Sequence, residues 1–241
     1  MSEGDAMRQS QDPAARVLRH LIPERIPWFA ASLYDRIAQS AISGYYREVA
    51  GQLVHRDSRE LILDVGTGPG YLPIEIARRA PGARIVAVDS SRAMIRIARK
   101  NSSAAGVADR IHFVRGDGNR LKFEDNLFDL VISTGSLHAW KCPVRVINEF
   151  HRVLKEGGTA WILDPAHLTS PEATKIVRGK LGIRGRLAHL WASVTSRVTP
   201  PYAPEEIAEI VRRTRFQQGK ITKQRWLSVE LTKGSDASGP T

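Results

Sequence analysis

The feature that most constrains the fold of this chain is a glycine-rich stretch at residues 60–71, with the sequence ELILDVGTGPGY. It begins with a short apolar run and then breaks into glycines at positions 66, 68 and 70. An apolar run of this length, bounded by glycines, predicts a buried strand. The glycines permit a tight turn and let a ligand approach the backbone closely. Helix-favouring sequence follows at once, so free N–H groups at the start of that helix are expected to point back at the ligand.

The spacing of the glycines bears on which ligand the turn binds. Dinucleotide-binding turns need G-x-G-x-x-G, whereas here the glycines fall at G-x-G-x-G and Tyr71 follows. Asp64 also lies inside the loop, where its charge repels a pyrophosphate and suits a ligand with an amino group and a positive centre. A glycine turn alone is equally compatible with a strand–helix turn in any α/β protein, so the following hundred residues must decide.

Strand and helix patterns alternate after this turn. Apolar runs at 84–88, 111–115, 128–133 and 159–163 predict strands, and segments at 91–105 and 144–154 predict helices. Alternation of this kind indicates parallel strands joined by helical crossovers, with ligands bound outside the carboxyl ends of the strands. Those ends carry Asp64, Asp89, Asp117 and Ser133. A single Asp at a strand end is often a turn former or helix cap, but three in succession favour a ligand site.

Composition limits the remaining possibilities. A chain of 241 residues is long enough for one large α/β domain. Its net charge of +11 attracts anionic partners but does not separate nucleic acid, anionic lipid and acidic metabolite. The single cysteine, Cys142, excludes an internal disulfide and any multi-cysteine metal site, and no metal is expected. The polar N-terminus and the lack of a long apolar run predict a cytoplasmic protein without a transmembrane segment.

The predicted organisation is one domain at residues 14–232, between a disordered N-terminus at 1–13 and a disordered tail at 233–241. Within it we distinguish a helical lid, a ligand-binding core, a substrate-specific insert and a closing helix with strands, at 14–56, 57–164, 165–204 and 205–232. The first helices either pack on the sheet edge or close over the ligand with their aromatic residues. The basic insert is either a solvated face or a cap that gathers an anionic or membrane-dissolved substrate.

Four segments resemble consecutive motifs of small-molecule class I S-adenosylmethionine (SAM)-dependent methyltransferases: LILDVGTGPGYLPIEIA, IVAVDSSRAMIRIARK, IHFVRGDGNRLKFEDNLFDLVISTGSLHAW and VINEFHRVLKEGGTAWILD. The general type is the group around the ubiquinone/menaquinone-pathway methyltransferases, and the resemblance covers about residues 60–164. It implies a Rossmann-like α/β fold, with a seven-stranded, mostly parallel sheet, helices on both faces and an antiparallel last strand. It also implies SAM as the cofactor.

The resemblance gives each acidic position a role. Asp89 is placed to accept both ribose hydroxyls, Asp117 to accept from the adenine amino group, and Asp64 to bind the ammonium of the cofactor. The backbone of Gly118 serves a ring nitrogen, while Gly66 and Gly68 keep side chains away from the methionine portion. The full set of predicted cofactor positions is Asp64, Gly66, Thr67, Gly68, Gly70, Asp89, Ser90, Met94, Asp117, Gly118, Asn119 and Ser133.

Catalytic and substrate positions are harder to assign from sequence. His138 follows the fourth predicted strand and is the candidate general base, because an imidazole titrates close to neutrality; the alternative is a packing residue. Candidate substrate residues are Tyr34, Tyr45, Trp140 and His167.

The predicted function is methyl transfer from SAM to a small-molecule acceptor, anionic or lipid-like, by in-line displacement. Residues 133–136 read STGS, without the Pro-Pro-aromatic or Pro-Cys motifs of nucleic-acid enzymes, so nucleic acid is not the expected partner. Two alternatives stay open: an RNA methyltransferase, favoured by the charge, and a SAM-binding protein without turnover.

Overall fold

The structure is a computed structural model that describes residues 43–55, 58, 60–164, 202–223 and 226–234. Most of the predicted lid and of the basic insert lies outside these residues, as do the candidate substrate residues Tyr34 and His167.

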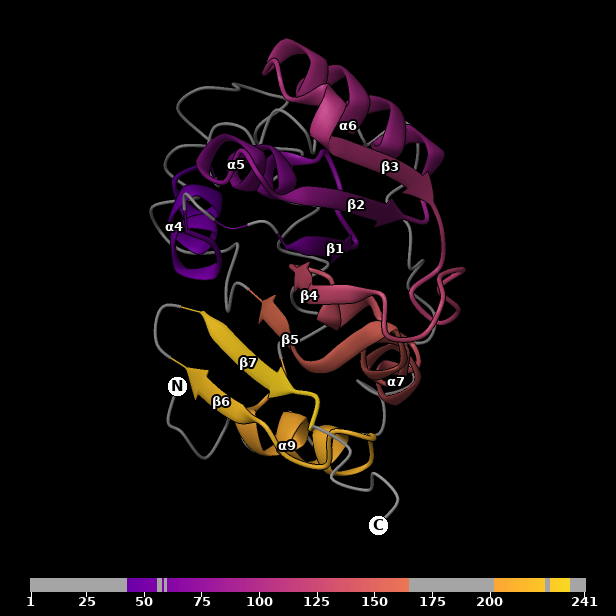
Figure 1. Cartoon of the computed structure of the whole chain (residues 1–241). Helices are drawn as coiled ribbons and strands as arrows, with labels where there is room; N and C mark the ends of the chain where they lie inside the picture. Colours follow the sequence, from indigo (N-terminus) through magenta and orange to yellow (C-terminus); the bar gives the residue numbers. More distant parts are fainter. Residues whose placement is uncertain (1–42, 56–57, 59, 165–201, 224–225, 235–241) are drawn as a thin grey trace, which may run out of the picture.

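Seven strands form one sheet in the order β3-β2-β1-β4-β5-β7-β6 (Figure 1). Strands β1 to β5 are parallel, and β7 runs antiparallel between β5 and β6. This arrangement confirms the predicted mostly parallel sheet with an antiparallel last strand. The strands are β1 Leu61–Val65, β2 Arg84–Asp89, β3 Ile111–Arg115, β4 Phe128–Thr134, β5 Leu154–Asp164, β6 Lys220–Lys223 and β7 Leu227–Thr232.

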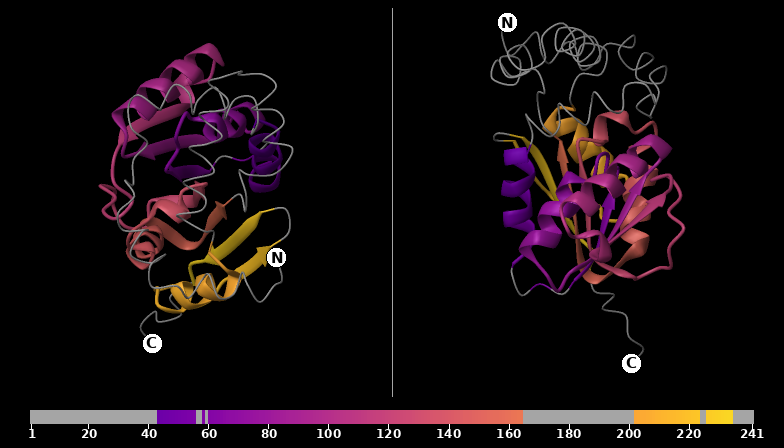
Figure 2. Two further views of the ribbon diagram at one scale, coloured as in Figure 1. Left: turned by 180° about the vertical axis from the view of Figure 1, so that it is seen from behind. Right: turned by 90° about the horizontal axis from the view of Figure 1, so that it is seen from above.

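The described helices cover both faces of the sheet (Figure 2). Three of them pack on one face: α4 Ser43–Leu53, α5 Tyr71–Arg79 and α6 Arg92–Ala104. The opposite face is covered by α7 Pro143–Val153 and α9 Pro204–Arg212. Local sequence explains where they start: the Ser91 hydroxyl caps α6 by accepting from the Met94 N–H, and α7 and α9 each begin at a proline.

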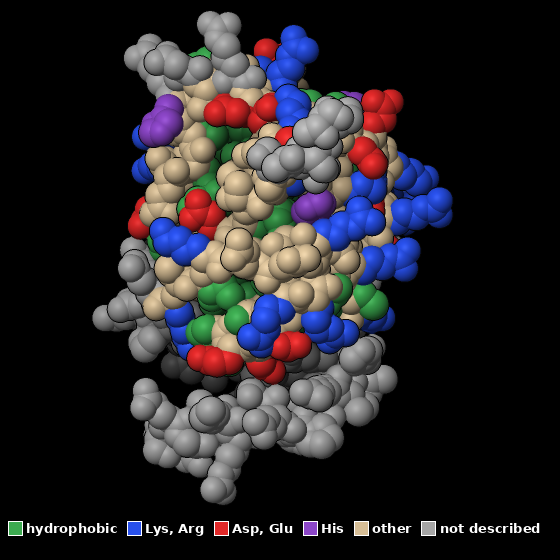
Figure 3. All heavy atoms as spheres, turned by 60° about the horizontal axis from the view of Figure 1, so that its bottom comes forward, with side chains coloured by type: hydrophobic (Ala, Val, Ile, Leu, Met, Phe, Trp, Pro, Cys, Tyr) green, Lys and Arg blue, Asp and Glu red, His purple; other side chains and the backbone are tan. Residues whose placement is uncertain are grey.

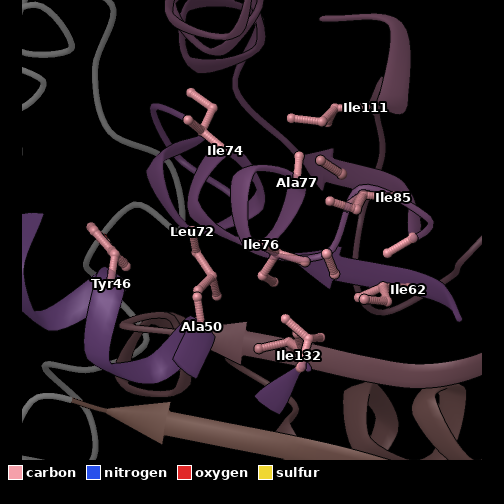
Figure 4. Close-up of a cluster of buried hydrophobic side chains, with 14 of the residues drawn as sticks. Tyr46, Ala50, Ile62, Leu72, Ile74, Ile76, Ala77, Ile85, Ile111 and Ile132 are labelled. Atoms are coloured by element: carbon pink, nitrogen blue, oxygen red, sulfur yellow. The ribbon is translucent and has the colours of Figure 1, made fainter. Parts of the chain in front are cut away.

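The central strand β1 is buried from both sides, which explains its apolar run. Ile62 faces the α4–α5–α6 layer with Ile76 and Ile85 (Figure 4), and Leu63 faces the α7 layer. All four side chains are at most 1% exposed. Burial on both sides fixes the register of β1, and with it the position of the loop that follows.

Strand β5 begins earlier than the sequence predicts. We expect it from residue 159, after a glycine pair, but it starts at Leu154 and contains both glycines. Gly158 lies there because a Cβ would come within 2.9 Å of the Lys155 carbonyl oxygen and 3.1 Å of the Asp129 carbonyl oxygen. The pairing of β4 with β5 shifts register nearby, between Phe128 and Leu130. The glycine pair therefore marks a close backbone approach within a strand.

Lys233, the first residue of the predicted tail, packs against the domain. It is only 7% exposed. Its ammonium donates to the Leu154 carbonyl oxygen at 3.0 Å and to Asn126 Oδ1, and it lies 3.0 Å from Glu156 Oε1. A lysine is buried only when its charge is paired in this way. The ordered part of the domain thus includes the first residue that the sequence assigns to the tail.

Arg152 of α7 fixes the connection that leads into β4. Its guanidinium donates to the carbonyl oxygens of Leu121 and Phe123, both at 2.8 Å, and to the carboxylates of Asp125 and Glu149. We expect Arg152→Lys to destabilise the protein by about 2–4 kcal/mol, because a lysine cannot reproduce the planar fork. Chemical denaturation measures this change.

A matched control for Arg152→Lys is Arg212→Lys. Arg212 forms an exposed ion pair with Glu209 within α9. Exposed pairs of this kind contribute about 0–1 kcal/mol, so this variant should unfold like the parent. Equal denaturation midpoints for the two variants would show that the Arg152 network is not a stabilising connection.

Lys and Arg outnumber Asp and Glu in the chain, 36 against 25. In the space-filling view of one face, Lys and Arg side chains gather along one side (Figure 3). Within the part of the chain that the structure describes, no helix is both long and apolar enough to cross a membrane.

Candidate functional site

The glycine turn after β1 is held by bonds from its own N–H groups. The N–H groups of Gly66 and Thr67 both donate to the Val88 carbonyl oxygen, at 2.8 and 3.0 Å, and Gly70 N donates to the Thr67 carbonyl at 3.0 Å. The N–H of Gly68 donates to Asp89 Oδ2 at 2.9 Å. A phosphate cradle needs such amides to point at the ligand, and here they are bonded within the protein. The turn is therefore unsuited to a pyrophosphate.

Asp89 joins this turn to the next helix. One carboxylate oxygen accepts from Gly68, and the other accepts from the Ser91 N–H at 2.8 Å. Each carboxylate oxygen has more than one lone pair, so each can accept more than one hydrogen bond. Ser90 follows and is half-buried. Met94, in the first turn of α6, is only 1% exposed. The end of β2 thus presents an ordered carboxylate beside the glycine turn.

Asp64 is a buried acid with a strongly perturbed pKa. Its side chain is 1% exposed and its Oδ1 has no hydrogen-bond partner. Its pKa is raised from 3.8 to about 7: burial is the largest cause, the nearby Thr67 side chain lowers the pKa, and the charge of Asp89 raises it. The Thr67 hydroxyl oxygen is itself buried without a hydrogen-bond partner, so its proximity to Asp64 does not amount to a well-formed bond. The turn thus contains two buried oxygen atoms without hydrogen-bond partners, Asp64 Oδ1 and Thr67 Oγ1.

Asp117 lies beyond the end of β3 and is exposed. Its Oδ1 accepts from both the N–H and the side-chain amide of Asn119, each at 2.9 Å. The Asn119 side-chain oxygen is buried without a partner. Between them, Gly118 has room for only a small residue, because a Cβ would come 3.3 Å from Val65 and 3.4 Å from Val146. This loop brings the end of β3 against the end of β1.

Ser133 and Ser136 close the turn from the side of β4. The buried Ser133 hydroxyl donates to the Val65 carbonyl oxygen at 2.7 Å. Ser136 lies over Gly66, whose carbonyl oxygen its hydroxyl approaches at 3.4 Å. A Cβ on Gly66 would come within 2.1 Å of the Ser136 hydroxyl oxygen. Gly66 is therefore required by its neighbour as well as by its φ of 80°.

The candidate base His138 lies in the 3-10 helix η2, Leu137–Ala139, after β4. Asp164 at the end of β5 faces it: Asp164 Oδ2 is 3.2 Å from the His138 backbone N and 3.4 Å from its Nδ1. Tyr45 of α4 lies near the same carboxylate. Burial, then the charge of Asp164, then that of Glu48, raise the pKa of its phenol. Its hydroxyl is buried and unpartnered.

Trp140 is placed mainly by packing. Its ring makes an edge contact with Phe150 of α7, with centroids 5.7 Å apart, and it packs on the core of that layer. This contact agrees with a structural role, and a role in substrate binding stays a prediction. Tyr45 also packs edge-on against Trp226, at 4.9 Å between centroids.

The residues at this edge of the sheet fit SAM better than a phosphate-bearing ligand. The buried, unpartnered oxygen of Asp64 is suited to accept from an ammonium, and Asp89 has acceptor capacity for ribose hydroxyls. The N–H groups of the glycine turn donate to acceptors within the protein, so they are not available to a phosphate. Among the described residues, no group of three or more His, Cys, Asp or Glu is arranged to hold a metal ion.

Comparison with known proteins agrees with this fit. The family model described as "Methyltransferase domain" matches residues 62–158. A demethylmenaquinone methyltransferase of Chlorobaculum tepidum is 30% identical over 61% of this chain and 59% of its own length. A ubiquinone/menaquinone biosynthesis C-methyltransferase of Cereibacter sphaeroides is 34% identical over 58% of each chain. The chain thus spans somewhat under two thirds of the length of these curated relatives.

Solved structures share the fold. A candidate SAM-dependent methyltransferase from Methanococcus maripaludis superposes with a TM-score of 0.72 at 24% identity, over 89% of this chain and 98% of that one. A SAM-dependent methyltransferase from Aquifex aeolicus gives 0.64 at 16% identity, over 86% and 99%. At under 25% identity these two likenesses show the shared fold, and the matched methyltransferase domain agrees with the family resemblance predicted from the sequence.

Two residues of the site are absent from the sequence-based assignment. Asp164 reads only as part of an Asp-Pro turn after the fifth strand, and Ser136 as part of the loop after the fourth. A usable signal exists for Asp164, because it ends a parallel strand as Asp89 does. For Ser136 the sequence offers none.

Proposed function

The chain carries a class I SAM-dependent methyltransferase domain, and from this premise we propose that it transfers the methyl group of SAM to a small-molecule acceptor by in-line displacement. When bound, SAM supplies a methyl carbon made electrophilic by its sulfonium. The residues of the chain bind and orient the reactants and exclude water, which is where most of the acceleration of such a displacement arises.

One observation carries the assignment of the cofactor site: the buried carboxyl group of Asp64, with an unpartnered oxygen, beside a turn whose amides are bonded internally. An ammonium group placed there would supply the missing hydrogen bond. Asp89 supports the same orientation, since its carboxylate lies between the turn and the start of α6 and can accept two adjacent hydroxyls. We assign Asp64 to the ammonium and Asp89 to the ribose.

The small-molecule class of acceptor is supported by the relatives. Those that match act, by their names, on demethylmenaquinone or in ubiquinone and menaquinone biosynthesis, which are small-molecule reactions. We propose an acceptor of the same general size for this chain, anionic or lipid-like. The basic surface favours an anionic group on it (Figure 3).

The first test is calorimetry with SAM, its demethylated product and NAD. We expect the first two to bind and NAD not to. Asp89→Asn should weaken SAM binding about 5- to 150-fold, because it removes the charge of an acceptor and about 1–3 kcal/mol with it. Asp109→Asn removes the same charge from a side chain that is 80% exposed, and it should bind SAM like the parent. Equal affinity in the Asp89 variant would remove this residue from the site.

The class of acceptor is tested separately with labelled SAM. We expect label in a small-molecule extract and none retained with tRNA, rRNA or duplex DNA on filters. Any nucleic-acid binding through the basic surface should fall steeply with salt. Stoichiometric transfer to one of the nucleic acids would replace the small-molecule proposal with the RNA or DNA alternative.

A further inference from the structure

The hydroxyl group of Tyr45, on α4, is buried and has no hydrogen-bond partner within the described part of the chain. The ring itself is held on two sides: it packs edge-on against Trp226, at 4.9 Å between centroids, and tilted against Tyr46, at 5.4 Å. Packing therefore explains the ring but not the hydroxyl. A buried tyrosine usually pairs its hydroxyl, so a buried one left unpaired calls for an explanation.

The carboxylate of Asp164, at the end of β5, lies near this hydroxyl. Its charge is the second cause, after burial, that raises the pKa of the Tyr45 phenol, and the charge of Glu48 is the third. The Asp164 side chain is only 9% exposed, and its Oδ2 accepts from the His138 backbone N–H at 3.2 Å. The loop after β4 thus holds the carboxylate in place, while the phenol near it is not bonded to it.

Strand β4 separates these two groups from the glycine turn. The Ser133 hydroxyl of β4 donates to the Val65 carbonyl oxygen at the end of β1. On its other side, Thr134 of β4 pairs with Leu163 of β5, and Asp164 is the next residue of β5. The ends of β1 and β2 carry the groups that we assign to the ammonium and the ribose. The end of β5 is therefore left for the acceptor.

Tyr45 and Asp164 offer different bonds to a ligand. Burial and two nearby negative charges keep Tyr45 a neutral phenol, which can donate its hydrogen, whereas a carboxylate only accepts. A hydroxyl group satisfies both, because it accepts one hydrogen bond and donates another. An ammonium would donate to Asp164 but could not accept from Tyr45. An anionic group would be repelled by Asp164 and Glu48.

We propose that Tyr45 and Asp164 together bind a hydroxyl group of the acceptor, with Tyr45 donating to its oxygen and Asp164 accepting its hydrogen. The proposal rests on the proposed function and deepens it by naming the acceptor as a hydroxyl compound. Both residues bind and position this group, which need not be the atom that is methylated. Any anionic group of the acceptor lies in another part of it, away from these carboxylates.

The first arm of the test needs no ligand. Tyr45→Phe removes only the hydroxyl and keeps the ring contacts. Because this hydroxyl is unpaired, the melting temperature of the ligand-free protein should stay the same or rise. The control is Thr214→Val, whose buried hydroxyl donates to the Val211 carbonyl oxygen at 2.7 Å, and which should melt about 2–4 °C lower. An equal fall in the two variants overturns the proposal.

The second arm measures binding of three probes by ¹⁹F NMR, with S-adenosylhomocysteine bound to the full-length protein. The probes are 4-fluorophenol, 4-fluoroanisole, which accepts but cannot donate, and 4-fluorobenzylamine, which carries an ammonium. We expect the parent to bind the phenol at least about 10-fold more tightly than either of the others, because a site built for a hydroxyl rejects analogues that lack it.

The variants assign each bond to one residue. Tyr45→Phe should weaken binding of the phenol about 3- to 10-fold, with S-adenosylhomocysteine affinity within twofold of the parent. Asp164→Asn should reduce the preference for the phenol over the anisole to less than about threefold, because the charged acceptor is lost. Thr214→Val should bind all three probes like the parent.

Four results of the second arm overturn the proposal: equal affinity for phenol and anisole, tighter binding of the benzylamine, no binding of the phenol up to its solubility, or undiminished phenol binding in Tyr45→Phe. Failure of the parent protein to bind SAM contradicts the proposed function instead. SAM binding without selection among the three probes contradicts only the hydroxyl site.

Discussion

Replacing Gly66 with alanine is expected to weaken SAM binding about 100-fold and to lower the melting temperature by about 5–15 °C. The backbone φ of 80° is strained for a residue with a Cβ, at roughly 1–2 kcal/mol. The added Cβ would also lie 2.1 Å from the Ser136 hydroxyl oxygen and 3.0 Å from its Cβ. Overpacking of this kind costs about 1–3 kcal/mol. Each kcal/mol corresponds to about 2–4 °C in a protein of this size.

Gly106→Ala is a control that separates the effect of backbone strain from that of the steric clash at Gly66. Gly106 has a φ of 69° and lies in the turn after α6, where an added Cβ would meet no atom within 4 Å. Gly106→Ala should therefore show the loss of stability from backbone strain without the loss of SAM affinity. Calorimetry and melting curves on both variants provide the comparison.

The double variant Gly66→Ala with Ser136→Gly tests the same contact from the other side. Removal of the Ser136 side chain takes away both close atoms, so part of the lost affinity should return, while the backbone strain remains. If Gly66→Ala behaves like Gly106→Ala, or if the double variant recovers nothing, the contact between Gly66 and Ser136 does not shape the site.

Most of the sheet could be predicted from the sequence. Strands β1 to β4 follow apolar runs, of which β1, β2 and β4 lie inside the sheet and β3 lies at its edge, and the turn after β1 follows from its glycines. These features depend on residues that are close together in the sequence, so one segment is enough to predict each of them. The same reasoning misplaced the start of β5, because the need for Gly158 depends on Asp129, a residue of another strand.

Contacts between distant segments could not be predicted in this way. Neither segment alone indicates that Asp164 faces His138, because this follows from the neighbouring places of β4 and β5. The burial of Lys233 likewise depends on Asn126 and Leu154, far away in the chain. The sequence places Asp64 in the site, but the perturbation of its pKa arises from atoms of several strands that cover it.

That perturbation gives the last prediction, which concerns pH. Without ligand, burial followed by the Asp89 charge raises the pKa of Asp64 to about 7, against the effect of Thr67. An ammonium needs the ionised carboxylate, so Asp64 must release its proton when SAM binds below this pH. Affinity should then rise roughly tenfold per pH unit up to about pH 7 and level off above it. Calorimetry in buffers of different ionisation enthalpy should detect the released proton.

Stability of the ligand-free protein should change in the opposite sense. The folded-state pKa is higher than the ordinary 3.8, so the folded protein holds a proton that the unfolded chain loses, and the contribution of Asp64 to stability falls between about pH 4 and pH 7. Asp64→Asn should remove this fall and also the pH dependence of SAM affinity, while binding SAM more weakly above pH 7. Asp109→Asn, which removes an equal charge from an exposed position, should keep both dependences. An affinity that is flat from pH 5 to pH 8 in the parent would mean that Asp64 does not meet the ammonium, because a buried acid that must ionise cannot bind a cation independently of pH.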